Sequence, residues 1–509
     1  MTAIASAAVL RARVFASSYR DSVELMRIAS ELERLPGITR AGLVMGTPAN
    51  RAVLQEAGLL SAVPDSAGAN DLIAAVAGSD PASAEEALER AAALLTTPTA
   101  DVSGAREAFV PTTLAEALSL GPANLAMIST PGTYATAEAL KALKRGLHVF
   151  LFSDNISVQD EIELKTLAAK KHLLLMGPDC GTAIIDGVPL GFTNAVARGS
   201  VGLIGASGTG LQQVTCLIDR LGAGVSQAIG VGGRDLDERV GGAMMLAALD
   251  LLAADPGTSV IVLLSKPPAP AVAERVLAKA RAAGKPVVVN FLGSDASLVR
   301  SAGLISAVTL EDAARAAVAV TRGAAPMAVD DGSSSELSPV AAAEAAKLAK
   351  GQRSVRGLYS GGSLAYEAKV ILKLELGDGA KGSTVIDLGD DEYTVGRPHP
   401  MIDPRLRNEH VVALGSDVEA AVLLLDVVIG NASHPDPAGA LAPAIAQARE
   451  SAKRAGRYLA VVASVCGTDR DAQGLAAQES TLVTAGALVQ PSNARAARLA
   501  ALIAKAARR

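Results

Sequence analysis

The sequence has 509 residues, half of them hydrophobic, so the chain can bury the cores of several domains. Trp is absent, aromatic residues make up 2% and the formal net charge is −5, which excludes an aromatic stacking platform or a basic footprint for nucleic acid. Three scattered cysteines fit neither a disulfide framework nor a zinc site. No secretory signal pattern and no long uninterrupted apolar run stand out. We therefore expect a cytoplasmic protein with no metal, no membrane contact and no nucleic-acid partner.

The first part of the chain indicates alternating strands and helices. Strands are predicted at 8–17, 41–45 and 71–77, and helices at 21–35, 48–57 and 82–95. This order predicts a small α+β domain of the ferredoxin-like type over residues 1–98.

Residues 99–198 are predicted to form a second domain. Short apolar runs at 125–129, 149–152 and 173–176 alternate with helical patterns at 136–145 and 159–171. Such strands are typical of a parallel sheet with helices on both faces.

Two further domains are predicted to be copies of one another. Residues 199–328 carry strands at 201–204, 228–231, 260–264 and 287–291, and residues 353–509 repeat the same order of features. Residues 329–352, which include the polar run 330–337, are predicted to be the linker between them. The alternative is that all doubly wound domains share such a pattern without being duplicated.

A glycine-rich turn follows the first strand of each copy, with the pattern S-G-x-x-L before a helix. Backbone N–H groups and the positive end of a helix dipole point at such a turn, so two of them could hold one anion. The predicted phosphate cradle consists of Ser207, Gly208 and Thr209 together with Ser360, Gly361, Gly362 and Ser363. In the alternative reading the glycines only permit tight packing and the serines cap the helices.

A dense polar run from residue 387 to residue 399 follows a predicted strand, where ligands of parallel sheets bind. Arg397 could clamp a carboxylate or phosphate, and His399 could act as a general acid or base. Asp387 and Asp390 could orient a substrate amide or hold a cation. We take these four residues as the catalytic candidates, and a solvated acidic loop as the alternative.

Several motifs resemble the succinyl-CoA synthetase superfamily. They are Gly177-Pro178-Asp179-Cys180-Gly181, the turn at 199–209 and Gly230-Val231-Gly232-Gly233. Together with the run at 387–401, they make nearly the whole chain similar to the FdrA family. The resemblance implies a CoA-binding-like Rossmann domain at 99–198 and two flavodoxin-like domains at 199–328 and 353–509. It also adds Asp179, Cys180, Gly232 and Gly233 as pocket residues.

Three departures from the synthetases limit the chemistry that the resemblance implies. The loop at 292–303 lacks the His that becomes phosphorylated in those enzymes, and no segment resembles an ATP-grasp domain. The stretch 107–114 has no glycine for a pyrophosphate to approach, so we expect no tight CoA binding.

The resemblance then implies a subunit of a hetero-oligomeric carbamoyltransferase, with a homodimer as a further option, and no tightly bound cofactor. Phosphate or carbamoyl phosphate would be a substrate, in the reaction of oxalurate with phosphate to give oxamate and carbamoyl phosphate in allantoin breakdown. An acyl-CoA synthetase subunit is the alternative enzyme. A scaffold subunit without catalytic activity is the alternative of another class.

Overall fold

The computed structural model describes residues 9–18, 20, 22–96, 111–325, 333–394 and 398–508. The chain divides into two compact units. The N-terminal unit contains residues 1–110 and the segment 395–397, and the main unit contains residues 111–394 and 398–509. In the described part of the chain, no helix combines the length and the apolar character needed to cross a membrane.

The N-terminal unit is a small α+β domain, as predicted. Its elements are β1 (Val9–Phe15), α1 (Ser22–Glu33), β2 (Ile38–Met45), α2 (Pro48–Glu56), η1 (Leu60–Ala62), β3 (Leu72–Gly78) and α3 (Pro81–Thr96). The three strands form an antiparallel sheet in the order β1-β3-β2. Because β3 is apolar along its whole length, its alternating side chains serve two cores, one beneath α1 and α3 and the other beneath α2.

The main unit begins with a small segment of three strands and three helices. Its elements are α4 (Leu114–Leu120), β4 (Leu125–Ile128), α5 (Gly132–Lys144), β5 (His148–Leu151), α6 (Val158–Lys170) and β6 (Leu175–Met176). The strands form a parallel sheet in the order β4-β5-β6. Thr113 and Glu116 form a reciprocal cap at the start of α4, which explains why this helix begins where it does.

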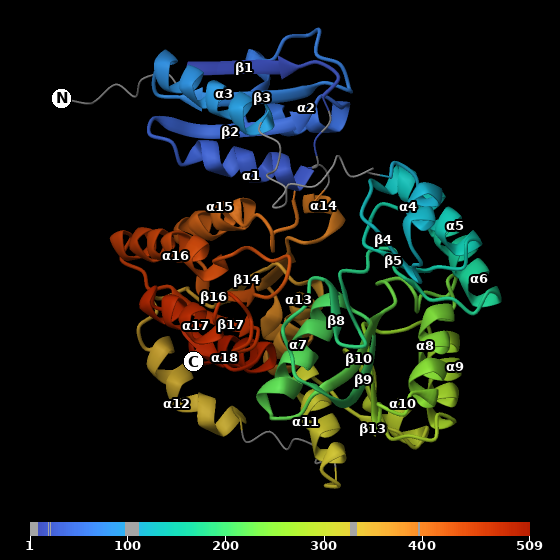
Figure 1. Ribbon diagram of the computed structural model, residues 1–509. Coiled ribbons are helices and arrows are strands. Elements are labelled where there is room, and N and C mark those ends of the chain that lie inside the picture. Colours follow the sequence, from blue (N-terminus) through green and yellow to red (C-terminus); the bar gives the residue numbers. More distant parts are fainter. Residues whose placement is uncertain are drawn as a thin grey trace. The chain divides into compact units, whose positions relative to one another are not determined.

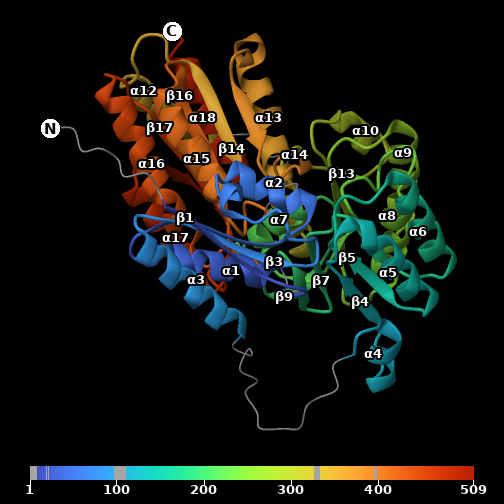
Figure 2. The ribbon, with the colours of Figure 1, turned by 90° about the horizontal axis from the view of Figure 1, so that it is seen from above.

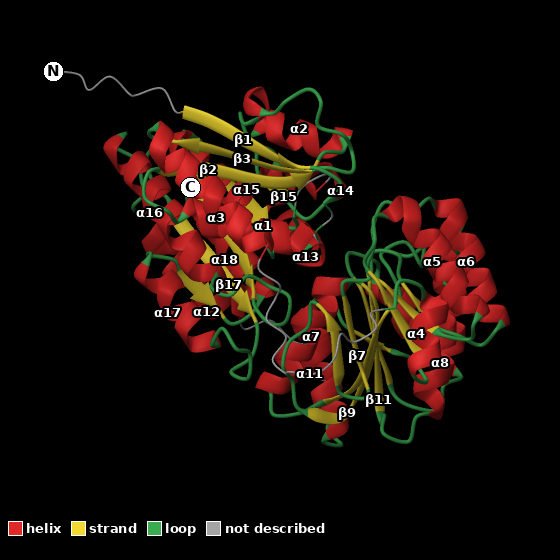
Figure 3. Ribbon diagram, turned by 45° about the horizontal axis from the view of Figure 1, so that its top comes forward, coloured by secondary structure: helices red, strands yellow, loops and turns green. Residues whose placement is uncertain are grey.

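A seven-stranded sheet follows. Its elements are β7 (Thr182–Ile185), β8 (Val188–Gly191), β9 (Arg198–Ala206), α7 (Gly208–Arg220), β10 (Val225–Gly230), α8 (Ala243–Ala254), β11 (Val260–Ser265), α9 (Pro270–Arg281), β12 (Val287–Phe291), α10 (Ala296–Ser301), β13 (Ile305–Ser306) and α11 (Leu310–Thr321). Their order in the sheet is β13-β12-β11-β9-β10-β7-β8. Figure 3 shows helices on both faces of this sheet, with α7 and α11 on one face and α8 on the other.

The predicted domain boundary at residue 198 cuts through this sheet. The hairpin β7–β8 precedes residue 198 in sequence, yet β7 pairs antiparallel with β10 through Ile184 and Ala228. The hairpin covers an edge that β10 would otherwise expose. Sequence periodicity does not reveal such pairing, because it arises between strands distant in the chain.

A five-stranded parallel sheet completes the main unit. Its elements are α12 (Ser333–Ala345), β14 (Ser354–Tyr359), α13 (Gly362–Leu376), η2 (Gly377–Ala380), β15 (Thr384–Asp387), α14 (Asp391–Thr394), α15 (Arg405–Ala413), η3 (Leu414–Ser416), β16 (Ala420–Val428), α16 (Pro437–Arg454), β17 (Ala460–Cys466), α17 (Leu475–Thr484), β18 (Leu488–Gln490) and α18 (Asn493–Ala506). The strand order is β15-β14-β16-β17-β18. Figure 2 shows β14, β16 and β17 between α16 and α13. The linker predicted at 329–352 is in part the helix α12, which packs on α18 and buries Leu337 and Ala341.

The duplicated fold appears in the strand order. The order β10-β9-β11-β12-β13 corresponds one to one with β15-β14-β16-β17-β18. It is the order of flavodoxin-like sheets, as predicted, in which the ligand crevice lies where the first strand adjoins the third. One apolar core joins both copies, because α7 and α11 of the first copy pack together with α13 and α18 of the second.

Candidate functional site

The first glycine-rich turn joins β9 to α7. Gly205 allows Leu211 to pack against the strand, since a Cβ at Gly205 would stand 2.7 Å from Leu211 Cγ. Ser207 precedes the helix in an extended conformation, and its side chain makes no capping hydrogen bond. The alternative reading of Ser207 as a helix cap is therefore wrong, and the first N–H groups of α7 have no partner in that side chain.

The second turn contacts the first. The hydroxyl oxygens of Ser207 and Ser363 lie 2.5 Å apart, and Ser363 N donates to Thr209 Oγ1 at 3.3 Å. A Cβ at Gly361 would stand 2.9 Å from Thr209 Cγ2, so glycine permits this approach. Helices α7 and α13 therefore start side by side (Figure 1). The two predicted turns meet, and phosphate binding there stays a prediction.

The second turn already holds an anion that belongs to the chain. Ser360 N and Gly361 N each donate to the carboxylate of Asp426 at 2.8 Å. Arg407 Nη1 donates to the same carboxylate at 3.1 Å, and both side chains are buried. Burial raises the pKa of Asp426, and the charge of Arg407 opposes that shift. The amides of Ser360 and Gly361 are thus used internally.

Strand register shows why the two turns differ. Ser265 of β11 lies opposite the residue before Ser207, and Asp426 of β16 lies level with the residue before Ser360. Ser265 and Asp426 therefore hold equivalent positions in the two copies. The second turn faces a carboxylate there, and the first faces a neutral hydroxyl. Within the described ranges, no carboxylate bonds to the amides of the first turn.

A small cavity opens beside the first turn. Its lining combines the first turn with the motifs at 177–181 and 230–233. The lining residues are Asp179, Cys180, Gly181, Thr182, Gly205, Ser207, Gly208, Gly230, Gly232 and Gly233. The four pocket residues that the resemblance added thus line one cavity with two of the predicted phosphate ligands.

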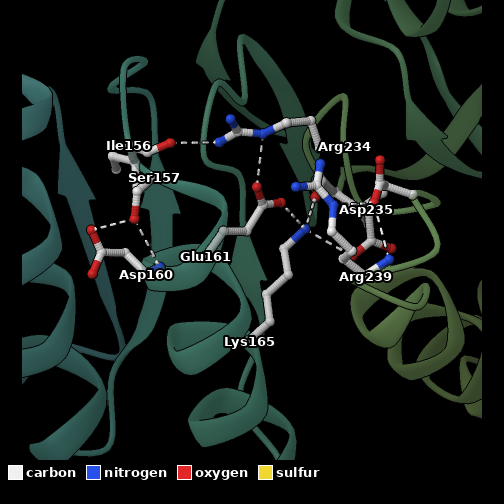
Figure 4. A network of polar contacts seen from close by, with 10 residues as sticks. Ile156, Ser157, Asp160, Glu161, Lys165, Arg234, Asp235 and Arg239 are labelled. Atoms are coloured by element: carbon white, nitrogen blue, oxygen red, sulfur yellow. Dashed lines mark hydrogen bonds and ion pairs between the residues drawn. The ribbon is translucent and has the colours of Figure 1, made fainter.

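The loop that carries Gly232 and Gly233 is held by a buried ion network (Figure 4). Lys165 Nζ of α6 donates to Val231 O at 2.9 Å and to Asp235 Oδ1 at 2.8 Å, and lies 2.8 Å from Glu161 Oε1. Arg234 donates to the same Glu161 at 2.9 Å. This network ties the cavity loop to α6.

Asp179 and Cys180 have different electrostatics. Surrounding protein and the charges of Asp391 and Asp154 raise the pKa of Asp179 to about 7, although its side chain remains accessible on the cavity wall. Burial raises the pKa of Cys180 to about 12, and its thiol donates to Thr182 O at 3.6 Å. Cys180 is therefore a protonated wall residue and unsuited to be a nucleophile.

Asp387 and His399 lie beside the second turn. A Cβ at Gly362 would stand 2.5 Å from Asp387 Oδ2, and one at Gly389 would stand 2.6 Å from His399 Nε2 and 3.2 Å from Asp387 Oδ1. Burial raises the pKa of Asp387, whereas burial and Arg407 lower the pKa of His399 to about 4. His399 is thus neutral near pH 7, with its Nδ1 accepting from Met401 N at 3.2 Å.

The remaining catalytic candidates are less informative. Asp390 is exposed and accepts a hydrogen bond from Glu392 N at 3.3 Å, so it shapes the start of α14. Arg397 lies outside the described residues.

Sequence reasoning missed Asp426, Arg407 and Lys165. Asp426 stands inside a continuous apolar strand, which is the signal that could have found it, because a charge there needs a partner. Glu161 and Lys165 form an i,i+4 pair, a spacing that usually marks an exposed helix face.

Three family models match the chain. They are "CoA-ligase" at 358–503, "CoA binding domain" at 197–293 and "AllF, heavy metal-associated domain" at 7–110. The CoA binding domain matches the segment that contains α7. The resemblance had led us to expect the CoA-binding-like domain at residues 99–198 instead. The glycine-free stretch at 107–114 lies outside this match and does not argue against CoA there.

The third match implies a metal that its residues do not fit. Residues 7–110 contain neither Cys nor His, so the thiolate and imidazole ligands that heavy metals prefer are missing from this segment. Among the described residues of the whole chain, no cluster of potential ligands could hold a metal ion.

Curated relatives include one of full length. The chain is 41% identical to "Uncharacterized protein YahF" of Escherichia coli over 95% of this chain and 96% of the relative. It is 28% identical to "Succinate--CoA ligase [ADP-forming] subunit alpha 2" of Archaeoglobus fulgidus over 30% of this chain and 53% of that subunit, about half of its length. Among solved structures, a dinucleotide-forming acetyl-coenzyme A synthetase of Ca. Korarchaeum cryptofilum is 18% identical, with a TM-score of 0.33, over 76% of this chain and 83% of that one.

Proposed function

This chain belongs to the same family as YahF and is built from succinyl-CoA synthetase-like domains, and from that premise we propose that it is a subunit of an acyl-transferring enzyme of the acyl-CoA ligase type. Other subunits would complete the complex, since relatives such as the Archaeoglobus protein are themselves named as subunits.

The cavity at the α7 turn carries this proposal. Phosphate would accept hydrogen bonds from the first N–H groups of α7, where the helix dipole favours negative charge. Ser207 and Gly208 line this cavity, and the equivalent amides of the second copy are taken by Asp426. We therefore place one phosphate at the first turn, in place of one shared between both turns.

The reaction would transfer an acyl group between phosphate and an acceptor. The acceptor forms a bond to the acyl carbon, the bond from that carbon to the phosphate oxygen breaks, and phosphate leaves with the electron pair. The proton of the acceptor passes to water. N–H groups already aimed at the leaving phosphate would stabilise its developing charge.

We propose two candidate acceptors, of which the comparisons favour the first. A CoA thiol is favoured by the match of the CoA binding domain at 197–293, which includes the cavity. Oxamate, with carbamoyl phosphate as the acyl phosphate, is favoured by the loop at 292–303, whose described residues contain no His for a phosphorylated relay. Carbamoyl phosphate is already activated and needs no such relay.

The test offers acyl phosphates to the full chain, alone and in its purified complex. Acetyl, succinyl and carbamoyl phosphate are combined with CoA or oxamate, and phosphate release and acyl products are quantified. CoA-dependent release supports the ligase reading, and oxamate-dependent release supports the carbamoyltransferase reading. Phosphate release should be lost in Gly208→Val, whose side chain would fill the cavity. It should be kept in the control Gly121→Val, because a Cβ at Gly121 meets nothing within 4 Å. A complex that releases no phosphate with either acceptor would favour the scaffold reading.

A further inference from the structure

A lysine stands at the ligand crevice of the first copy and takes no part in the features described so far. Ser265, the last residue of β11, pairs with Ala206 of β9, so Lys266 and Ser207 leave the sheet side by side. These are the first and third strands of the flavodoxin-like order, between which ligands bind. Lys266 does not line the cavity itself but follows the strand beside Ser207, which does.

The Lys266 side chain is exposed and unpaired within the described residues. Its Nζ lies 5.8 Å from the ring centroid of Tyr366 of α13. The other cations near the cavity are already engaged, Lys165 and Arg234 with Glu161, and Arg407 with Asp426. Among these four cations of the described part of the chain, Lys266 is the one without a carboxylate partner.

Carboxylates surround this lysine without pairing with it. Burial raises the pKa of both Asp179 on the cavity wall and Asp387 at the end of β15, and the nearby charge of Lys266 opposes each rise. Asp154 and Asp391 add further negative charge near Asp179. A substrate with its own carboxylate would be repelled from this rim unless a cation met it.

The crevice of the second copy differs from that of the first. Its equivalent crevice, between β14 and β16, is closed by Asp426 bound to the amides of Ser360 and Gly361. The two crevices are therefore unequal. One is filled by an internal anion, and the other presents N–H groups and a free lysine.

We propose that Lys266 binds the carboxylate of a small acyl substrate or acceptor while phosphate occupies the α7 turn. The inference rests on the proposed function and adds that the substrate carries a carboxylate in addition to the transferring acyl group. Two anionic groups need two binding elements. The diffuse positive end of α7 suits the phosphate, and the compact ammonium of Lys266 suits the carboxylate.

The test measures binding by calorimetry, with oxamate and succinate as probes and phosphate held at saturation. Lys266→Met should lower the affinity for whichever probe the wild type binds more tightly by at least about tenfold. Lys266→Arg should restore much of that affinity because it keeps the positive charge. Lys369→Met, which removes an exposed lysine of α13, should bind like the wild type. When phosphate is titrated without either probe, its affinity should change less than about twofold in every variant.

A second readout does not depend on activity. Either probe should slow reductive methylation of Lys266, followed by mass spectrometry, and leave Lys369 unaffected. The inference is overturned if Lys266→Met binds both probes normally, if phosphate affinity falls along with probe affinity, or if the wild type binds neither probe. Phosphate binding by the wild type, measured first, separates this failure from that of the proposed function.

Discussion

The carboxylate of Asp426 accepts a hydrogen bond of 2.8 Å from the backbone amide of Ser360, so the second glycine-rich turn holds an anion supplied by its own chain. This contact breaks the functional symmetry of two domains with the same strand order. It leaves the first turn, between β9 and α7, as the place for an external anion.

Replacement of Asp426 by Asn should be strongly destabilising. The change leaves the guanidinium of Arg407 buried without its counter-ion, which typically costs about 3–5 kcal/mol. Urea denaturation of the full chain measures this loss. Asp403→Asn breaks the more exposed pair with Arg405 and should cost about 1 kcal/mol or less. Equal losses in the two variants would contradict the buried role of Asp426.

Lys165→Met should weaken phosphate binding although Lys165 does not line the cavity. The variant removes the bonds that hold Val231 and Asp235, and leaves Glu161 and Asp235 buried without their shared cation. Thermal melts and phosphate titrations should both show a loss. Lys170→Met, on the exposed part of the same helix, serves as the control and should change stability by less than about 0.5 kcal/mol. Wild-type phosphate affinity in Lys165→Met would show that the network does not position the loop.

His399 should make stability depend on pH in the acid range. Its pKa falls from 6.5 to about 4 on folding, so the unfolded chain binds the proton first as the pH drops. The contribution of His399 is complete above pH 6.5 and is lost progressively toward pH 4, with a slope of up to about 1.4 kcal/mol per pH unit.

Denaturation series between pH 7 and pH 4 check this expectation. His399→Asn keeps an acceptor for Met401 N and should flatten the slope, whereas His172→Asn, at an exposed residue, should leave it as in the wild type. A slope that is the same in all three proteins would show that His399 titrates alike in the folded and unfolded chains.

Arg397 stays a candidate on sequence grounds alone. Pro398 favours an extended conformation for it, which suits a side chain reaching into a cleft. If Arg397 clamps a carboxylate with both arms, Arg397→Lys should fold normally but lower turnover at least about tenfold, because an ammonium cannot reproduce the planar fork. Steady-state kinetics with a thermal melt decides this, and normal turnover would remove Arg397 from the site.

The sequence predicted those features that depend on local pattern. Short apolar runs and S-G-x-x-L turns were sufficient for the parallel sheets, the duplication and the meeting of the two turns. The hairpin β7–β8 and the helix α12 were assigned wrongly because their positions depend on pairing with distant segments, β10 and α18.

The chemistry of the candidate site was harder to predict. Ser207 and Ser360 look alike in sequence, and only the register of β11 and β16 shows that Ser265 stands where Asp426 stands in the other copy. Lys266 has no motif around it and is marked only by its place at the strand end.

Calorimetric titration of inorganic phosphate into the full chain decides whether the α7 turn holds a single phosphate. We predict one phosphate per chain for the wild type and for Gly121→Val, and no measurable binding for Gly208→Val, whose side chain would enter the cavity beside Ser207. Two phosphates per chain, no binding by the wild type, or unchanged binding by Gly208→Val would each contradict a single phosphate site at the α7 turn.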